Sequence, residues 1–103
     1  MSKMIDAAKD GNLFMIKRLF SRKIRLDQAD ADKWTPIHYA VQNGHDEVVK
    51  FLIQQGVNVN CRTSSGNTPL HFAAQNANEF LLINLIESGA DLNAVDNVFF
   101  RLT

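Results

Sequence analysis

Two histidines are the residues of this chain whose type and spacing best suit metal chemistry. His38 stands in the sequence TPIHYA, at 35–40, and His71 stands in the related sequence TPLHFA, at 68–73. Zinc needs its ligands within about 2 Å and usually takes four of them. Neither histidine has a carboxylate or thiol near it at a spacing typical of metal ligands. We therefore predict structural histidines, with no metal and no cofactor.

Cys61 is the one candidate for a thiol nucleophile. A reactive thiolate needs basic neighbours that lower its pKa, and only Arg62 stands directly beside it. No nucleophile and base recur together at a useful spacing, and no glycine-rich phosphate loop is present. We predict that the chain has no catalytic residues and is not an enzyme.

The N-terminal sequence, the apolar runs and the cysteine count indicate where in the cell the protein is located. The opening MSKMIDAAKD lacks the apolar core of a secretory signal, and no apolar run reaches the roughly 18 residues of a membrane span. A single cysteine cannot form an internal disulfide. We expect a location in the cytoplasm or the nucleus and no membrane partner.

The spacing of the histidines belongs to a repeat that runs through most of the chain. The offset that aligns His38 with His71 also aligns Leu52 with Leu85, and backward it aligns Gly44 with Gly11. A fixed period of about 33 residues indicates stacked structural units. Equivalent residues of stacked units lie about one helix spacing apart, ~8–10 Å, which leaves little room for the two histidines to share an ion.

Each unit predicts two short helices. Thr35 and Thr68 stand at N-cap positions, and the prolines that follow suit the first helical turn. The first helices should end near Gln42 and Gln75, and Gly44 should be left-handed. A second helix should run from Asp46 to Gly56, with His45 at the surface near its start. No unit buries its apolar residues alone, so the units must stack.

The segments WTPIHYAVQNGHDEVVKFLIQQGVNVN and GNTPLHFAAQN…LLINLIESGADLN resemble the ankyrin repeat. The resemblance implies an all-α solenoid of stacked helix-turn-helix units with hairpin loops, forming one domain over residues 1–103. We predict an N-terminal capping unit at 2–27, full repeats at 30–62 and 63–95, and a truncated or diverged repeat start at 96–103.

The resemblance also implies binding of another protein through a concave face of hairpins and first helices. On this chain the implied partner-binding residues are Asp32, Lys33, Trp34, Gln42, Asn43, Arg62, Ser64, Ser65, Asn67, Gln75 and Asn76. Trp34 stands out because a rigid aromatic among polar residues has the composition of a hot spot. The alternative for Trp34 is that its ring folds back over the N-terminal unit.

Charge is distributed unevenly along the chain. Residues 1–26 hold seven basic and two acidic residues, a net +5, whereas residues 27–103 hold four basic and nine acidic residues, a net −5. The basic cluster consists of Lys17, Arg18, Arg22, Lys23 and Arg25. It suits an acidic partner, but no aromatic platform is interleaved with it, so we do not expect nucleic acid.

Several positions depart from the repeat pattern. Lys33 and Ala77 stand where glycine is usual, and a left-handed conformation at Lys33 would cost about 1 kcal/mol. If Ala77 has a positive φ, Ala77→Gly should stabilise the fold by about 0.5–1 kcal/mol, measured by denaturant unfolding.

In some relatives the asparagine that closes the repeat is hydroxylated. Asn60 and Asn93 match that position but also suit a plain structural role.

The two ends of the array lead to different expectations. The N-terminal unit has charged outer positions, as a polar cap requires. At the other end, we expect Leu70, Leu81, Leu82, Leu85 and Ile86 to lack a covering repeat. Phe99, Phe100 and Leu102 would either fold onto that face or pair with a second copy as a homodimer. A third hypothesis is that the chain is the N-terminal piece of a larger ankyrin-repeat protein, such as a kinase, channel or ubiquitin-ligase adaptor.

Overall fold

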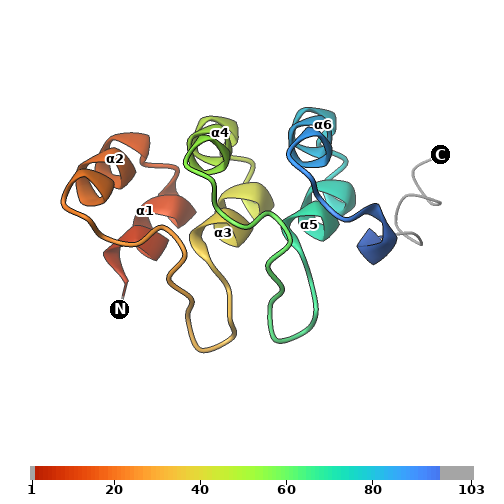
Figure 1. Cartoon of the computed structure of the whole chain (residues 1–103), viewed down its shortest axis with the longest axis horizontal. Coiled ribbons are helices and arrows are strands. Elements are labelled where there is room, and N and C mark those ends of the chain that lie inside the picture. The colour runs from red at the N-terminus through yellow and green to blue at the C-terminus, as the bar shows by residue number, and fades with distance from the viewer. Residues whose placement is uncertain (1, 96–103) are drawn as a thin grey trace.

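The computed structural model describes residues 2–95, whose regular structure consists of six α-helices and one short 3-10 helix. The helices form three consecutive pairs (Figure 1). The pairs are α1 (Lys3–Asp10) with α2 (Leu13–Ser21), α3 (Pro36–Gln42) with α4 (Asp46–Gln54), and α5 (Pro69–Gln75) with α6 (Glu79–Glu87). The 3-10 helix η1 (Leu92–Val95) follows.

The pairs stack into two rows of helices. The first helices α1, α3 and α5 pack side by side, and α2, α4 and α6 form a second row above them (Figure 1). Loops 22–35 and 55–68 carry hairpins that project away from both rows (Figure 1). The predicted solenoid of helix pairs with hairpin loops is therefore confirmed.

Local sequence determines where the repeat helices begin and end. Thr35 and Thr68 are the N-caps of α3 and α5, each followed by proline in the first turn. These helices end at Gln42 and Gln75, as predicted. A backbone in the left-handed region follows in both repeats, with φ of 72° at Gly44 and 52° at Ala77.

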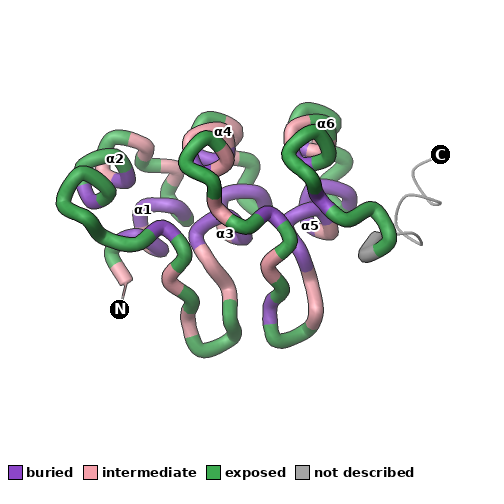
Figure 2. The backbone as a smooth tube through the Cα atoms, viewed as in Figure 1, coloured by how far each residue is buried: buried purple, intermediate pink, exposed green. Residues whose placement is uncertain are grey.

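The core runs between the rows and through all three pairs. Its largest fully buried apolar side chains are Met4, Ile16, Val41, Val48, Val49, Leu52, Leu70, Leu81 and Leu85. Burial is concentrated on the first helices, whereas the hairpin tips and the outer sides of the second helices are exposed (Figure 2). The hydrophobic effect thus holds the units together, because the buried side chains of all three pairs form one cluster and α3 packs against both α1 and α5.

Gly11 shows how closely consecutive units approach. Its φ is +70°, and an added Cβ would lie 2.5 Å from Nδ1 of His45. The His45 ring packs over this glycine and its Nε2 donates a 2.8 Å hydrogen bond to the carbonyl oxygen of Lys9. His45, the N-cap of α4, is half-buried and joins two units, whereas the sequence predicted only a surface residue.

Most of the residues expected to form an uncovered apolar face at the C-terminal end are buried, and other residues of α6 are exposed there instead. Leu70, Leu81 and Leu85 are completely buried, because α5 and α6 pack against each other and against the preceding pair. The exposed apolar side chains of α6 are Phe80 (39%), Ile83 (56%) and Ile86 (36%), of which only Ile86 was predicted. Phe99, Phe100 and Leu102 lie outside the described residues.

The N-terminal unit is not uniformly polar on its outside. Phe14, on α2, is 73% exposed, the highest exposure of any large apolar residue in the described part of the chain. The prediction of a charged outer surface for this unit is therefore incomplete. The backbone also holds an unpredicted left-handed residue here, Lys23, with φ of 67°.

Candidate functional site

His38 is a structural residue that ties the start of α3 to the loop that follows α4. The backbone N–H of Thr35 donates to His38 Nδ1 at 3.0 Å, so Nδ1 must be the unprotonated acceptor. Nε2 then carries the proton and donates to the carbonyl oxygen of Cys61 at 2.9 Å. Burial lowers the pKa of His38 and keeps the ring neutral. With both nitrogens engaged, His38 offers no lone pair to a metal.

His71 repeats part of this arrangement one unit later. Its Nδ1 accepts from the backbone N–H of Thr68 at 2.9 Å. Among residues 2–95, no three His, Cys, Asp or Glu side chains are grouped as metal ligands would be. In both repeats the histidine of the Thr-Pro-x-His sequence thus accepts a hydrogen bond from the backbone at the start of its own helix, the structural role that the sequence predicted for it.

Cys61 is half-buried beside the same histidine. Its Sγ lies 3.5 Å from Oγ1 of Thr35 and 3.8 Å from Nε2 of His38. Burial raises the pKa of the Cys61 thiol and outweighs the opposing effect of the Thr35 hydrogen bond. The thiol is therefore protonated at neutral pH, and its surroundings are those of a packing residue rather than a nucleophile.

Asparagine amides join consecutive units through backbone atoms. Asn43 Nδ2 donates to the carbonyl oxygen of Lys9 at 3.1 Å, and at the equivalent position of the next repeat Asn76 Nδ2 donates to that of Gln42 at 2.9 Å. Asn60 donates to the carbonyl oxygen of Gly89 at 3.1 Å and accepts from the N–H of Asp91 at 2.7 Å. Asn60 thus has the structural role proposed for it.

An aromatic group joins the first hairpin to two first helices, and we call Trp34, Tyr39 and Phe72 the aromatic platform. The Trp34 ring stacks on Phe72 of α5 at 4.7 Å between centroids and lies 4.7 Å from the Tyr39 ring of α3. Lys9 of α1 places its Nζ 4.7 Å from the centre of the Tyr39 ring. Trp34 therefore packs onto α3 and α5, and it does not fold back over the N-terminal unit.

Asp30 holds this platform in place. Its Oδ1 accepts 3.0 Å hydrogen bonds from the backbone N–H groups of Asp32 and Trp34, and its Oδ2 accepts from the Tyr39 hydroxyl. Desolvation raises the pKa of Asp30, but these donors together outweigh it and hold the pKa below its usual value. Burial, followed by the bond to Asp30, raises the pKa of Tyr39 to about 12.

The predicted partner-binding residues surround the platform and differ in their burial. Trp34 and Asn67 are half-buried, and the other nine are exposed: Asp32, Lys33, Gln42, Asn43, Arg62, Ser64, Ser65, Gln75 and Asn76. The two hairpins are joined by a hydrogen bond from the N–H of Ser64 to the carbonyl oxygen of Asp32, at 2.9 Å. The hairpins and first helices thus present one continuous surface, which we call the hairpin face.

Comparison with known proteins agrees with this geometry. A family model described as ankyrin repeats, in three copies, matches residues 4–96. The chain belongs to the ankyrin-repeat family. A search of curated proteins found no significant match. Within the described part of this ankyrin-repeat chain, no helix is long and apolar enough to cross a membrane.

Sequence reasoning missed three members of the site on this ankyrin-repeat array, Lys9, Tyr39 and Phe72, and identified Asp30 only as a polar neighbour of Trp34. A usable signal existed for two of them, because Tyr39 and Phe72 follow the histidine of the two Thr-Pro-x-His sequences and are both aromatic. Asp30 occupies the position that Thr63 fills in the next repeat. Lys9 gave no sequence signal, since its role depends on contact across units.

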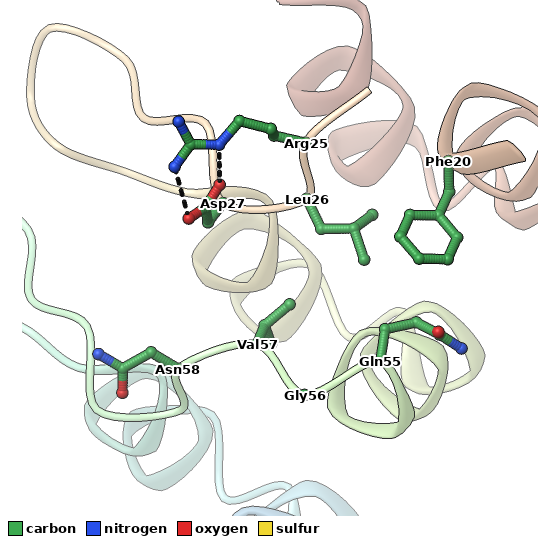
Figure 3. Close-up of a pocket in the computed structure, with 8 residues that line it drawn as sticks. All are labelled: Phe20, Arg25, Leu26, Asp27, Gln55, Gly56, Val57 and Asn58. Atoms are coloured by element: carbon green, nitrogen blue, oxygen red, sulfur yellow. Dashed lines mark hydrogen bonds and ion pairs between the residues drawn. The ribbon is translucent and has the colours of Figure 1, made fainter. Parts of the chain in front are cut away.

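A groove on the side of the array is a second candidate surface (Figure 3). It has a volume of about 430 Å³ and lies between the loops that follow α2 and α4, lined by Phe20, Arg25, Leu26, Asp27, Gln55, Gly56, Val57 and Asn58. Arg25 and Asp27 form a bidentate pair at 2.9 Å, and the hydrogen bond from Arg25 lowers the pKa of Asp27. Because these charges neutralise each other, the groove has no charged group aimed at a ligand.

Proposed function

We propose that this ankyrin-repeat chain binds another protein through the hairpin face and carries out no catalysis. Ankyrin repeats are generally protein-interaction modules. The observation that supports this face is the aromatic platform, which brings Trp34 together with side chains of α3 and α5, while Lys9 of α1 lies over its Tyr39 ring. A cytoplasmic or nuclear location belongs to the same proposal.

The platform has the physical properties of a binding centre. Its rings are preorganised, because Trp34 is fixed by Phe72 on one unit and by Asp30 and Tyr39 on its own. A partner that contacts it therefore orders few additional side chains on this surface, which reduces the entropic cost of binding. Polar, exposed side chains surround the aromatic centre, as at typical protein interfaces.

The residues that best test the proposal are those that do not support the fold. Trp34 is a poor choice for this purpose because its loss would also remove packing on Phe72. Gln42 and Gln75 are exposed at the ends of α3 and α5 and occupy equivalent positions of the two repeats. Two arginines at these positions would add charge and bulk to the hairpin face without emptying the core.

The test compares proteins captured from cell lysate by the wild-type chain and by Gln42→Arg/Gln75→Arg. We expect the double variant to lose captured proteins by at least tenfold in quantitative mass spectrometry. Gln54→Arg is the matched control, because Gln54 is also exposed but lies at the end of α4, in the other row. Undiminished capture by the double variant, or equal loss with the control, would contradict the proposed face.

A further inference from the structure

Contacts between the second helices show which positions face the next unit. Lys17 of α2 places its Nζ 5.7 Å from the Phe51 ring centre on α4, and Phe20 meets the same ring edge-on at 5.9 Å. Lys50, the equivalent of Lys17 in the next repeat, reaches the ring of Phe80 on α6, at 6.0 Å. The positions of Lys17, Lys50 and Phe20 therefore face forward along the array, and those of Phe51 and Phe80 face backward.

These positions recur at the two ends of the array, where no unit covers them among the described residues. On α6 the forward positions are Ile83, the equivalent of Lys50, and Ile86, the equivalent of Phe20, and they are 56% and 36% exposed. On α2 the backward positions are Phe14, the equivalent of Phe80, which is 73% exposed, and Arg18, the equivalent of Phe51, which is also exposed. The two ends thus carry the two halves of an interface of the kind that joins α2 to α4 and α4 to α6.

The rest of the C-terminal end is arranged differently. The 3-10 helix η1 packs on α5, so the first helix of the last pair already has a neighbour on this side. Leu92 of η1 is 47% exposed and adds to the apolar surface. The exposed apolar residues at the C-terminal end therefore form an edge made by α6 and η1. The second helix of a following unit would lie beside this edge.

Charge indicates what covers this edge. Residues 1–27, which include the Arg25–Asp27 pair, carry seven basic and three acidic residues, a net +4, and residues 63–95 carry three acidic residues with no lysine or arginine, a net −3. Two C-terminal units brought together would repel each other, whereas an N-terminal unit brought to a C-terminal unit is attracted. We propose that copies of this chain associate head to tail, with Phe14 of one copy packing on Ile83 and Ile86 of the next.

This contact is heterologous, so each copy keeps one unused end after it binds. Such contacts lead to open chains or closed rings rather than to simple dimers. The inference is independent of the proposed function, because the hairpin face takes no part in it. Binding of a different protein and self-association can therefore fail separately.

The experiment measures sedimentation velocity of the full chain up to about 200 μM, a concentration that reveals contacts of micromolar to sub-millimolar affinity. We expect the sedimentation coefficient to rise steadily with concentration without reaching a dimer plateau. Raising the ionic strength from about 0.1 M to about 1 M shortens the screening length from about 10 Å to about 3 Å and should weaken the association. Association that strengthens with salt would overturn the head-to-tail orientation.

Two variants decide the geometry, and both alter exposed side chains, so the fold should survive. Phe14→Glu blocks the head and Ile83→Lys blocks the tail, and each alone should remain monomeric at about 200 μM. Mixed in equal amounts, they should form a one-to-one heterodimer, because one variant keeps its tail and the other its head. A monomeric wild type, or self-association of Phe14→Glu alone, would overturn the proposal. So would a mixture that stays monomeric.

Discussion

The two hairpins of this chain have the same backbone and different side chains. In each, the N–H of the first residue donates to a carbonyl oxygen further along the hairpin at 2.9 Å, from Asp30 to Trp34 and from Thr63 to Asn67. In each, the fourth residue is left-handed, with φ of 62° at Lys33 and 82° at Gly66. The two hairpins therefore adopt the same turn with different residues, lysine in one and glycine in the other, at the left-handed position.

The difference lies in how the side chains support the turn. Thr63 accepts one hydrogen bond at its hydroxyl, from the N–H of Asn67 at 3.2 Å, and is almost fully buried. Asp30 accepts three, from two backbone groups and the Tyr39 hydroxyl, and Trp34 adds its packing on Phe72. The first hairpin thus tolerates a strained lysine because more interactions hold it, and those interactions also build the proposed binding centre.

The largest expected effect comes from removing the aromatic ring that only the first hairpin has. Trp34→Ala should lower the free energy of unfolding by about 3 kcal/mol, since a half-buried aromatic loses its stacking and its contact area. The equivalent change Asn67→Ala should cost about 0.5 kcal/mol or less. Urea denaturation of both variants measures the difference. Similar losses would show that the ring is not a structural part of the first hairpin.

The next largest effect compares Asp30 and Thr63, the side chains that accept hydrogen bonds from the backbone of the two hairpins. Asp30→Ala should cost about 2 kcal/mol, because an anionic acceptor with three donors is lost, and Thr63→Ala should cost about 1 kcal/mol. The folded-state pKa of Asp30 is lowered, so its contribution is present above the unfolded pKa of about 3.9 and lost as pH falls through the folded pKa. Unfolding measured at neutral and strongly acidic pH should therefore show the Asp30→Ala difference shrinking in acid, which the Thr63→Ala difference should not do.

Exchanging the left-handed residues of the two hairpins should change stability by smaller amounts, with opposite signs in the two hairpins. Lys33→Gly should stabilise the chain by about 0.5 kcal/mol by removing strain at a positive φ, and Gly66→Lys should destabilise it by about 1 kcal/mol. A Cβ at Gly66 would meet no atom within 4 Å, so the expected cost is that of the backbone alone. Thermal unfolding of both variants tests the exchange, and a loss of stability in Lys33→Gly would mean that its side chain matters more than its strain.

The smallest change in stability should accompany the clearest spectroscopic change. Asp30→Asn keeps the size of the side chain and one carbonyl acceptor, so we expect a loss below about 1 kcal/mol. Tyr39 is the only tyrosine, and its pKa of about 12 should fall toward the ordinary value of 10.0 in this variant. Absorbance titration of the tyrosinate measures it directly. Asp46→Asn, on α4, is the control, and an equal fall there would rule out Asp30 as the cause.

Much of the fold was predictable because its signals are local. Thr35, Pro36 and the matching residues of the next repeat fix the helix starts within a short stretch of sequence. The buried side of α6 was not predictable, since most of the residues in EFLLINLIE are Phe, Leu or Ile. With apolar residues on nearly every side, the period does not distinguish buried Leu81 and Leu85 from exposed Ile83.

The candidate site was predictable only in outline. The position of Trp34 at the hairpin marked it in the sequence, but its partner Phe72 stands in the next repeat and on another unit. Lys9 and Tyr39 are likewise far apart in the sequence, and their contact depends on how two helices pack and which rotamers fit. Such contacts arise from the stacking of units and leave no pattern in a single repeat.

The asparagine bonds between units have a consequence for how such a chain can lengthen. Asn43 and Asn76 each bind a carbonyl oxygen of the preceding unit, and Asn60 binds backbone atoms of the following one. In each case the neighbour supplies only main-chain atoms, which every residue type possesses. A tandem gene duplication that copied one whole repeat would therefore carry these joints with it, and its neighbours would need no matching mutation to accept the new unit.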